Sequence, residues 1–347
     1  SHVVSISFLT TMQRCKIISS HEQQMESNIH KCNKCSYLVN LLGFILLIRY
    51  NLIKKGGDMP NWNKILTEVE ASNQINALEK MRKEYFDVIH RETGRNVISY
   101  YSGWLKVSVP QVMIDEQDKN AFMSIIHELD KNIGVDIIMH TPGGDIAATE
   151  SLINYLHKIF NGDIRVIIPQ IAMSAGTMIA LSSKAIFMGK QSSLGPVDPQ
   201  YNGVACQAIV EEFEQAKKDV TENPNTIGLW QTIISKYPAT FIHECQNAIN
   251  WSNDLMDKWL PNVYPRIDIL KVKDKFLNHK NSCSHFRHLS KEDCRSVGLN
   301  IIDLEESPKL NDAVMNLHNC YMIMIDKFQY AKIVENQKGE IYIYRTM

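Results

Sequence analysis

The apolar residues of the first well-patterned stretch follow a helical period. From Trp62 to His90 they fall every three or four residues, and Thr93-Gly94 then ends the pattern. This spacing predicts one long amphipathic helix. Residues 96–104 are rich in β-branched and aromatic side chains and predict a strand, and residues 119–129 predict a further helix.

The most regular pattern alternates short apolar runs with helical ones. The apolar runs are residues 135–139, 165–168 and 185–188, and helical patterns at 147–160 and 174–183 separate them. Strand–helix–strand order with short loops is typical of parallel strands joined by right-handed crossovers. We therefore predict that these three strands lie side by side and parallel in one sheet.

The remainder of the chain is mostly helical in pattern, and it closes with a predicted hairpin of 331–335 against 340–344. No repeat or linker interrupts residues 59–347. We therefore expect one α/β domain with a core at about 94–205, a helical region at 206–330 and a hairpin at 331–345. The predicted helices of the second half are 206–220, 225–236, 239–260, 266–278, 290–297 and 308–328.

The first 58 residues differ from the rest of the chain. Their apolar run at 37–48 is shorter than the roughly 20 residues that a membrane-spanning helix needs, and no small-x-small cleavage site follows it. Cys32 and Cys35 form a CxxC pair without a second pair at zinc spacing. We expect no metal at this pair.

Two explanations of residues 1–58 remain open. The codons for Lys54-Lys55-Gly56-Gly57-Asp58 can be written as a purine-rich stretch that resembles a bacterial ribosome-binding site just before Met59. Residues 1–58 would then be largely a translated leader of a bacterial protein whose native start is Met59. The alternative is a genuine membrane anchor through residues 37–48.

The composition excludes several classes of protein. Its 37 basic and 38 acidic residues create no global field for a polyanion, so a dedicated nucleic-acid binder is not expected. Eight irregularly spaced cysteines form no disulfide framework and favour reduced thiols in the cytoplasm. The sequence has no phosphate-binding loop, dinucleotide fingerprint, EF-hand or HExxH motif, so we predict no cofactor and no catalytic metal.

Two turns at the carboxyl ends of neighbouring predicted strands are the candidates for chemistry. Thr141-Pro142-Gly143-Gly144 offers backbone N–H groups to an anion or oxyanion, and Ala172–Thr177 places Ser174 at the start of a helix. Alone, each turn has an ordinary explanation, as a strand–helix turn and as a serine N-cap. Together, on one sheet edge, they place a nucleophile beside backbone donors.

Three motifs, in this order and spacing, resemble the serine dehydrogenase proteinase (SDH-type) family. They are HTPGG at 140–144, AMSAGTMIAL at 172–181 and MGKQSSLGPVDPQ at 188–200. The family is similar to Clp protease and signal peptide peptidase A in the Clp/crotonase superfamily. The resemblance runs from about Met59 to Ile301, and it implies a spiral of repeated β-β-α units with helical C-terminal decoration.

The same resemblance implies roles for individual residues. Ser174 would be the nucleophile, and Gly143 or Gly144 together with the N–H of Ala175 would form the oxyanion hole. Residues 194–200 would shape the substrate groove. Clp-like folds also assemble into rings or stacked trimers, so the resemblance implies a homo-oligomer. Apolar surface for its assembly is expected on the helices after residue 206, which carry Trp230, Trp251 and Trp259.

The general base stays open at this stage. Clp-type proteases place a histidine about 25 residues after the serine, where this chain has Asp198 and Pro199. His285 lies in a Ser-His element that resembles one of the family, although Phe286 stands where glycine is expected. A lysine, as in signal-peptide-peptidase-like enzymes, is the alternative. The candidate lysines are Lys217, Lys218 and Lys236.

Three functions are therefore compared. The first is a serine peptidase that cleaves peptide bonds through a Ser174 acyl-enzyme, with a protein or peptide as substrate. The second is an acyl-thioester enzyme on the same scaffold. The third is a scaffold or partner-binding protein without a competent base.

Overall fold

The computed structural model describes residues 62–71 and 74–346. Residues 59–347 form one compact unit by their internal contacts. The expectations for residues 1–58, namely a leader or a membrane anchor and an empty CxxC pair, lie outside the described residues. Among the helices that are described, none combines the length and apolar character needed to span a bilayer.

A seven-stranded sheet forms the centre of this unit. Its order is β11-β10-β1-β2-β3-β5-β9, in which the five strands from β1 to β9 are mutually parallel and β10 and β11 form an antiparallel hairpin at one edge. The predicted side-by-side arrangement of three parallel strands and the predicted hairpin are both confirmed. The bounds are β1 Asn96–Ser102, β2 Val135–His140, β3 Ile164–Ile168, β5 Ala185–Met188, β9 Ile301–Asp303, β10 Tyr330–Asn336 and β11 Ile341–Arg345.

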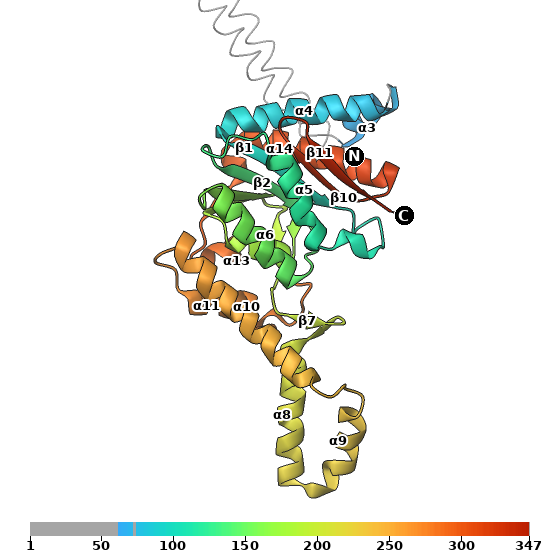
Figure 1. Cartoon of the computed structure of the whole chain (residues 1–347), viewed down its shortest axis with the longest axis vertical. Helices are drawn as coiled ribbons and strands as arrows, with labels where there is room; N and C mark the ends of the chain where they lie inside the picture. The colour runs from blue at the N-terminus through green and yellow to red at the C-terminus, as the bar shows by residue number, and fades with distance from the viewer. Residues whose placement is uncertain (1–61, 72–73, 347) are drawn as a thin grey trace, which may run out of the picture. The chain divides into compact units, whose positions relative to one another are not determined.

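Helices cover both faces of the sheet (Figure 1). One face carries α4 (Gln74–Thr93) and α14 (Pro308–Phe328), which pack on each other and on β1 and β10. The other face carries α5 (Glu116–Ile126), α6 (Ile146–Ile159) and α7 (Ala175–Leu181). The core is thus two layers of apolar side chains, one on each side of the sheet.

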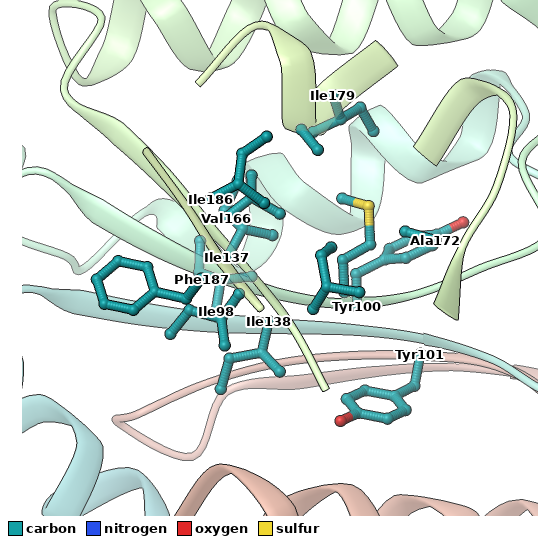
Figure 2. Packing of buried hydrophobic residues seen from close by; sticks show 14 of the residues in the cluster. Ile98, Tyr100, Tyr101, Ile137, Ile138, Val166, Ala172, Ile179, Ile186 and Phe187 are labelled. Carbon is teal, nitrogen blue, oxygen red and sulfur yellow. The ribbon is translucent and has the colours of Figure 1, made fainter. Parts of the chain in front are cut away.

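Side chains of successive strand residues alternate between these two layers, as β-structure requires. Tyr100 stacks on Phe122 of α5, with ring centroids 6.0 Å apart, whereas Tyr101 stacks on Tyr321 of α14 at 4.3 Å. Figure 2 shows these two tyrosines on opposite sides of the sheet, with Ile179 of α7 above it. Because the strands are buried on both faces, their sequences read as continuous apolar runs.

The strands of the core are followed by short second strands, which build the strand–strand–helix unit that the family resemblance implies. β3 continues through a turn into β4 (Ile171–Ala172), and β5 continues into β6 (Ser193–Leu194), which pairs in parallel with β4. Thr141, directly after β2, forms a parallel bridge with Ala172. These short second strands carry the backbone turns from which the site is built.

The prediction of one helix over residues 62–90 is wrong. Two helices occupy this stretch, α3 (Trp62–Ala71) and α4. Residues 72 and 73 separate them in the sequence and lie outside the described residues. Strand β9 was not predicted, because three residues are too few to show a period.

The first helices after residue 205 extend from the sheet as an arm (Figure 1). This arm consists of α8 (Cys206–Glu222), α9 (Ile227–Ile234) and α10 (Phe241–Val263), so the helices predicted here are confirmed with small shifts of their ends. It has its own small core, built around Cys206, Ile209, Phe241 and Cys245. The remaining elements are η1 Pro110–Val112, β7 Gln200–Tyr201, β8 Val204–Ala205, η2 Pro224–Thr226, α11 Ile269–Phe276, α12 His279–Ser282, α13 Lys291–Ser296 and η3 Leu304–Glu306.

Two histidines are buried between the sheet and α14. His140, the last residue of β2, packs against Trp104 and His318 with ring centroids 4.3 and 5.2 Å away, and neither of its ring nitrogens makes a well-formed hydrogen bond with a described residue. Burial, and secondarily His318, hold the pKa of His140 well below its usual value, which the Ile171 carbonyl opposes only weakly. Burial lowers the pKa of His318 to about 4.

We expect the free energy of unfolding to fall as the pH is lowered from about 6.5 toward 4. The unfolded chain protonates His140 and His318 near pH 6.5, whereas the folded protein keeps His318 neutral down to about pH 4. The unfolded state therefore binds more protons in this range, and acid favours it. His318 alone accounts for on the order of 3 kcal/mol. Urea unfolding at a series of pH values measures the slope.

The matched variants for this prediction are two histidine-to-glutamine changes. His318→Gln removes the titrating group from the core and should flatten the pH dependence of the unfolding free energy. His127→Gln changes an exposed histidine at the end of α5 and should leave the dependence unaltered. A wild-type unfolding free energy that is constant between about pH 7 and pH 5 would contradict the prediction.

Candidate active site

Ser174 joins β4 to α7 in a strained conformation. Its φ of 51° and ψ of −117° lie where non-glycine residues are rare, at a cost of about 1–3 kcal/mol. Its side chain makes no capping hydrogen bond to α7, so the explanation as an ordinary serine N-cap is wrong. The strain turns the side chain out of the helix start, as in other strand–helix turns that expose a nucleophile.

The residues around Ser174 are small because its turn is tightly packed. A Cβ atom at Gly176 would lie 2.4 Å from Thr141 Cγ2, and one at Gly195 would lie 2.4 Å from Met173 Cε. The Thr177 hydroxyl donates to the Ala172 carbonyl and accepts from the Gly195 N–H, both at 3.0 Å. This buried hydroxyl locks the turn to the loop after β6.

The Pro142-Gly143-Gly144 turn lies directly against Ser174. A Cβ atom added to Gly143 would lie 2.6 Å from Ser174 Cβ and 2.9 Å from the Ala175 nitrogen. Gly143 also has a φ of +100°, which only glycine adopts without strain. The two turns selected from the sequence therefore meet at one edge of the sheet.

Gly143 also decides where the next backbone N–H points. Thr141 pairs with β4, whereas the Gly143 carbonyl accepts from the Ile114 N–H at 2.8 Å and the Asp145 N–H donates to the Ile114 carbonyl at 2.9 Å. In a regular strand, residues 141 and 145 would present their N–H groups to the same side. At Gly143, which has a positive φ, the sides are reversed, and the Gly144 N–H therefore does not face Ile114.

His285 is held by a buried carboxylate. Its Nδ1 donates to Asp198 Oδ1 at 2.8 Å, and the Asp198 side chain is only 1% exposed. Asp198 and His285 line the same cleft as Ser174. Asp198 occupies the motif position where Clp-type proteases have histidine. The groove-shaping motif of the sequence thus supplies a charged partner for His285.

A second histidine binds the other oxygen of the same carboxylate. His279 Nδ1 donates to Asp198 Oδ2 at 2.8 Å, and Gln200 Nε2 donates to Oδ2 at 2.7 Å. Sequence reasoning missed His279, because no motif surrounds it and 81 residues separate it from Asp198. Among the described residues no cluster is arranged to hold a metal ion.

The cleft has a volume of about 930 Å³ and is mostly apolar. Phe286, which stands where the family resemblance leads one to expect glycine, is 77% exposed, and its ring meets the His285 ring edge-on at 5.9 Å. This departure from the motif therefore leaves His285 at the cleft. The larger apolar side chains of the lining are Trp104, Val107, Val109, Val112, Met113, Ile146, Met178, Val197 and Phe286.

The three candidate lysines lie on the arm. Lys217 and Lys218 of α8 are exposed and reach Glu214 and Glu222, at 2.6 and 4.0 Å, and Lys236 is exposed after α9. None of them is among the described residues that line the cleft. Of the candidate bases, only His285 is among the described residues that line the cleft.

Ser174 and the bonded His285–Asp198 pair line one cleft, and serine hydrolases combine these three residue types at their active sites. The family model of ClpP-like SDH-type serine proteinases matches residues 29–330. The chain belongs to this family.

Individual relatives match shorter parts of the chain. Two uncharacterised proteins of Methanocaldococcus jannaschii are 33% identical over 143 residues and 34% identical over 106 residues, which is 41% and 30% of this chain. The matches span 47% and 36% of those proteins, so less than half of either relative is covered. Among solved structures, a mutant of a membrane-bound stomatin-specific protease aligns over 56% of this chain and 77% of its own, with 18% identity and a TM-score of 0.35.

Proposed function

We propose that the chain is a serine endopeptidase in which Ser174 is the nucleophile, His285 the general base and Asp198 the residue that orients the base. One observation carries the proposal: a strained serine shares a cleft with a histidine whose Nδ1 is bonded to a buried carboxylate at 2.8 Å. That bond fixes the tautomer in which Nε2 of His285 is unprotonated and able to accept a proton.

The reaction follows from these roles. Ser174 Oγ attacks the carbonyl carbon of a peptide bond while its proton passes to His285 Nε2, and the carbonyl electrons move onto oxygen. Collapse of this intermediate breaks the C–N bond, and His285 returns the proton to the leaving amine. Water, activated in the same way, then releases the acyl group.

The oxyanion is assigned to two backbone donors. The N–H of Ala175 lies in the first turn of α7, where helical N–H groups have no intrahelical acceptor. The second donor is Gly144 rather than Gly143, since the N–H of Gly143 already donates to Thr141 Oγ1 at 3.2 Å. Removing one such donor typically costs about 10²–10³ in rate.

A fluorophosphonate probe tests the proposal without a known substrate. The folded full-length chain should react once per active site, and peptide mapping should find the adduct on Ser174. The same protein denatured in urea should not react, because an isolated serine is a weak nucleophile. A folded protein that is not labelled would instead support the acyl-thioester or scaffold functions.

We also propose that the protein is a homo-oligomer. The support is α9 of the arm, none of whose residues is buried, with Leu229 62% exposed. Trp259, counted from the sequence as available surface, is instead buried in α10. Light scattering at micromolar concentration should give a multiple of the chain mass. Leu229→Glu should lower that mass, whereas Gln231→Glu on the same helix should not; a single-chain mass for the wild type would refute the proposal.

A cytoplasmic location and the absence of cofactors and nucleic acid stay proposals that rest on the sequence. The described cysteines are all free thiols. The relatives found are archaeal, so the bacterial source inferred from the codons before Met59 has no support from them. Membrane association that disappears on truncation to Met59 would favour the anchor over the leader.

A further inference from the structure

The carboxylate of Asp198 binds two imidazoles, and only one of them belongs to the proposed machinery. His285 lines the cleft, whereas His279 begins α12 and is not among the lining residues described. The backbone N–H of His279 donates to Gln207 Oε1 of α8 at 2.6 Å, so this histidine is fixed through its main chain as well as its ring. The proposed function gives no role to this second bond.

Resting on the proposed function, we propose that His279 is a positioning residue for the Asp198–His285 pair. It holds Asp198 Oδ2 so that Oδ1 faces His285, and it competes with His285 for the proton that the carboxylate attracts. The second role is distinct from the first, because a neutral amide could hold the carboxylate but could not take up a proton.

The fixed position of the carboxylate follows from the three donors. Asp198 Oδ2 accepts hydrogen bonds from His279 and Gln200, and Asp198 Oδ1 accepts one from His285, all at 2.7–2.8 Å. A carboxylate bonded on one oxygen only is free to rotate about its Cβ–Cγ bond. With Oδ2 held from two directions, rotation is blocked and the His285 ring keeps its orientation.

The competition for the proton follows from charge and exposure. One buried negative charge can balance one imidazolium, and the two histidines depend on the same carboxylate. His279 is 26% exposed and His285 is 16% exposed, and burial opposes the charged form. The one charge that Asp198 can balance is therefore shared between two imidazoles, and His279 is the more exposed of the two.

Few other charged or titratable groups face this pair. The Cys206 thiol of α8 lies near Asp198, and burial and its Cys245 partner raise its pKa to about 12, so it stays neutral. Lys280, next to His279, is paired with Glu211 at 3.0 Å. In the described surroundings, the competition thus involves one carboxylate and two imidazoles.

The rate of fluorophosphonate labelling of the full-length chain, followed from about pH 5 to pH 8, tests the proposal. His279→Asn keeps a donor at the position of Nδ1 but cannot be protonated. We expect the acid side of its rate profile to move to higher pH by about half a unit or more, since coupled groups interact by about one pK unit. His288→Asn is the matched control: His288 lies close in sequence but bonds to Ser193 Oγ at 2.7 Å, and its profile should not move.

A second variant separates the two roles. His279→Ala removes the donor as well, and we expect its labelling to be about tenfold slower than wild type at all pH values. His279→Asn should restore the labelling rate at neutral pH. Profiles of wild type and His279→Asn that superimpose would overturn the proposal, while labelling of wild-type Ser174 would leave the proposed function standing. If His279→Asn does not fold, NMR of ¹⁵N-labelled histidines in the wild type decides, because protonation of His285 before His279 would overturn it.

Discussion

Replacing Ser174 by alanine is expected to abolish both labelling and hydrolysis, with a loss of roughly 10⁴–10⁶ in rate. The stability should change little, by less than about 1 kcal/mol, because the hydroxyl makes no capping bond whose loss would cost energy. The backbone strain also remains, because a φ of 51° is as unfavourable for alanine as for serine. Peptide hydrolysis and urea unfolding of the same preparation measure the two effects.

Ser182→Ala provides the opposite pattern. Ser182 ends α7, is buried and donates to the Ile179 carbonyl at 2.8 Å, so its loss should cost about 1 kcal/mol of stability and leave labelling intact. Loss of activity in both variants would indicate damage to α7 rather than removal of a nucleophile. Full activity of Ser174→Ala would end the serine-hydrolase proposal.

The parts of the fold that could be predicted are those whose structure is determined by neighbouring residues in the sequence. Strands β2, β3 and β5 are short apolar runs between turns, and their order with the crossover helices leaves one plausible arrangement. The closing hairpin is similarly local. Strands of two or three residues, such as β4, β6 and β9, carry no period. β4 and β6 pair with each other, and β9 pairs with the edge of β5.

The site also has a part that local sequence predicts and a part that it does not. The two turns at 141–144 and 172–177 could be predicted together, because each follows one of two neighbouring predicted strands and each lies in a motif that resembles the family. The bonds from Asp198 to His279 and His285 cross 81 and 87 residues, and no local rule connects such positions. The strain at Ser174 was also hidden, since a serine before a helix ordinarily predicts a cap.

The buried carboxylates of Asp136 and Asp198 differ in the side chains that they bind, and this difference indicates which of them has a structural role and which a catalytic one. Asp136, near the start of β2, binds Arg95 at 2.8 Å and Arg165 at 2.6 Å. Guanidinium groups keep their protons at all ordinary pH values, so this cluster can only hold the strands together. Asp198 instead binds two imidazoles, and imidazole is the usual general acid or base in proteins. A buried acid with titratable partners, open to a cleft, is suited to proton transfer.

Asp198→Asn is therefore expected to lower the rate of labelling and hydrolysis by about 10⁴ while the fold persists, the loss reported for the corresponding change in a Ser-His-Asp triad. An asparagine offers one oxygen and one NH₂ group, so it cannot accept from both His279 and His285. The histidine facing the NH₂ group must take the other tautomer, and for His285 that tautomer places the proton on Nε2, where the serine proton has to go.

The control for this change is another acid of the same cleft. Asp145 caps α6 by accepting from the Ala148 N–H at 2.8 Å, and asparagine caps equally well, so Asp145→Asn should retain activity within about tenfold. A histidine base also requires the wild-type rate to rise between about pH 6 and 7, whereas a lysine base would give a rise nearer pH 8. Full activity of Asp198→Asn together with a rise only above about pH 8 would move the base to Lys217, Lys218, Lys236 or a neighbouring copy of the chain.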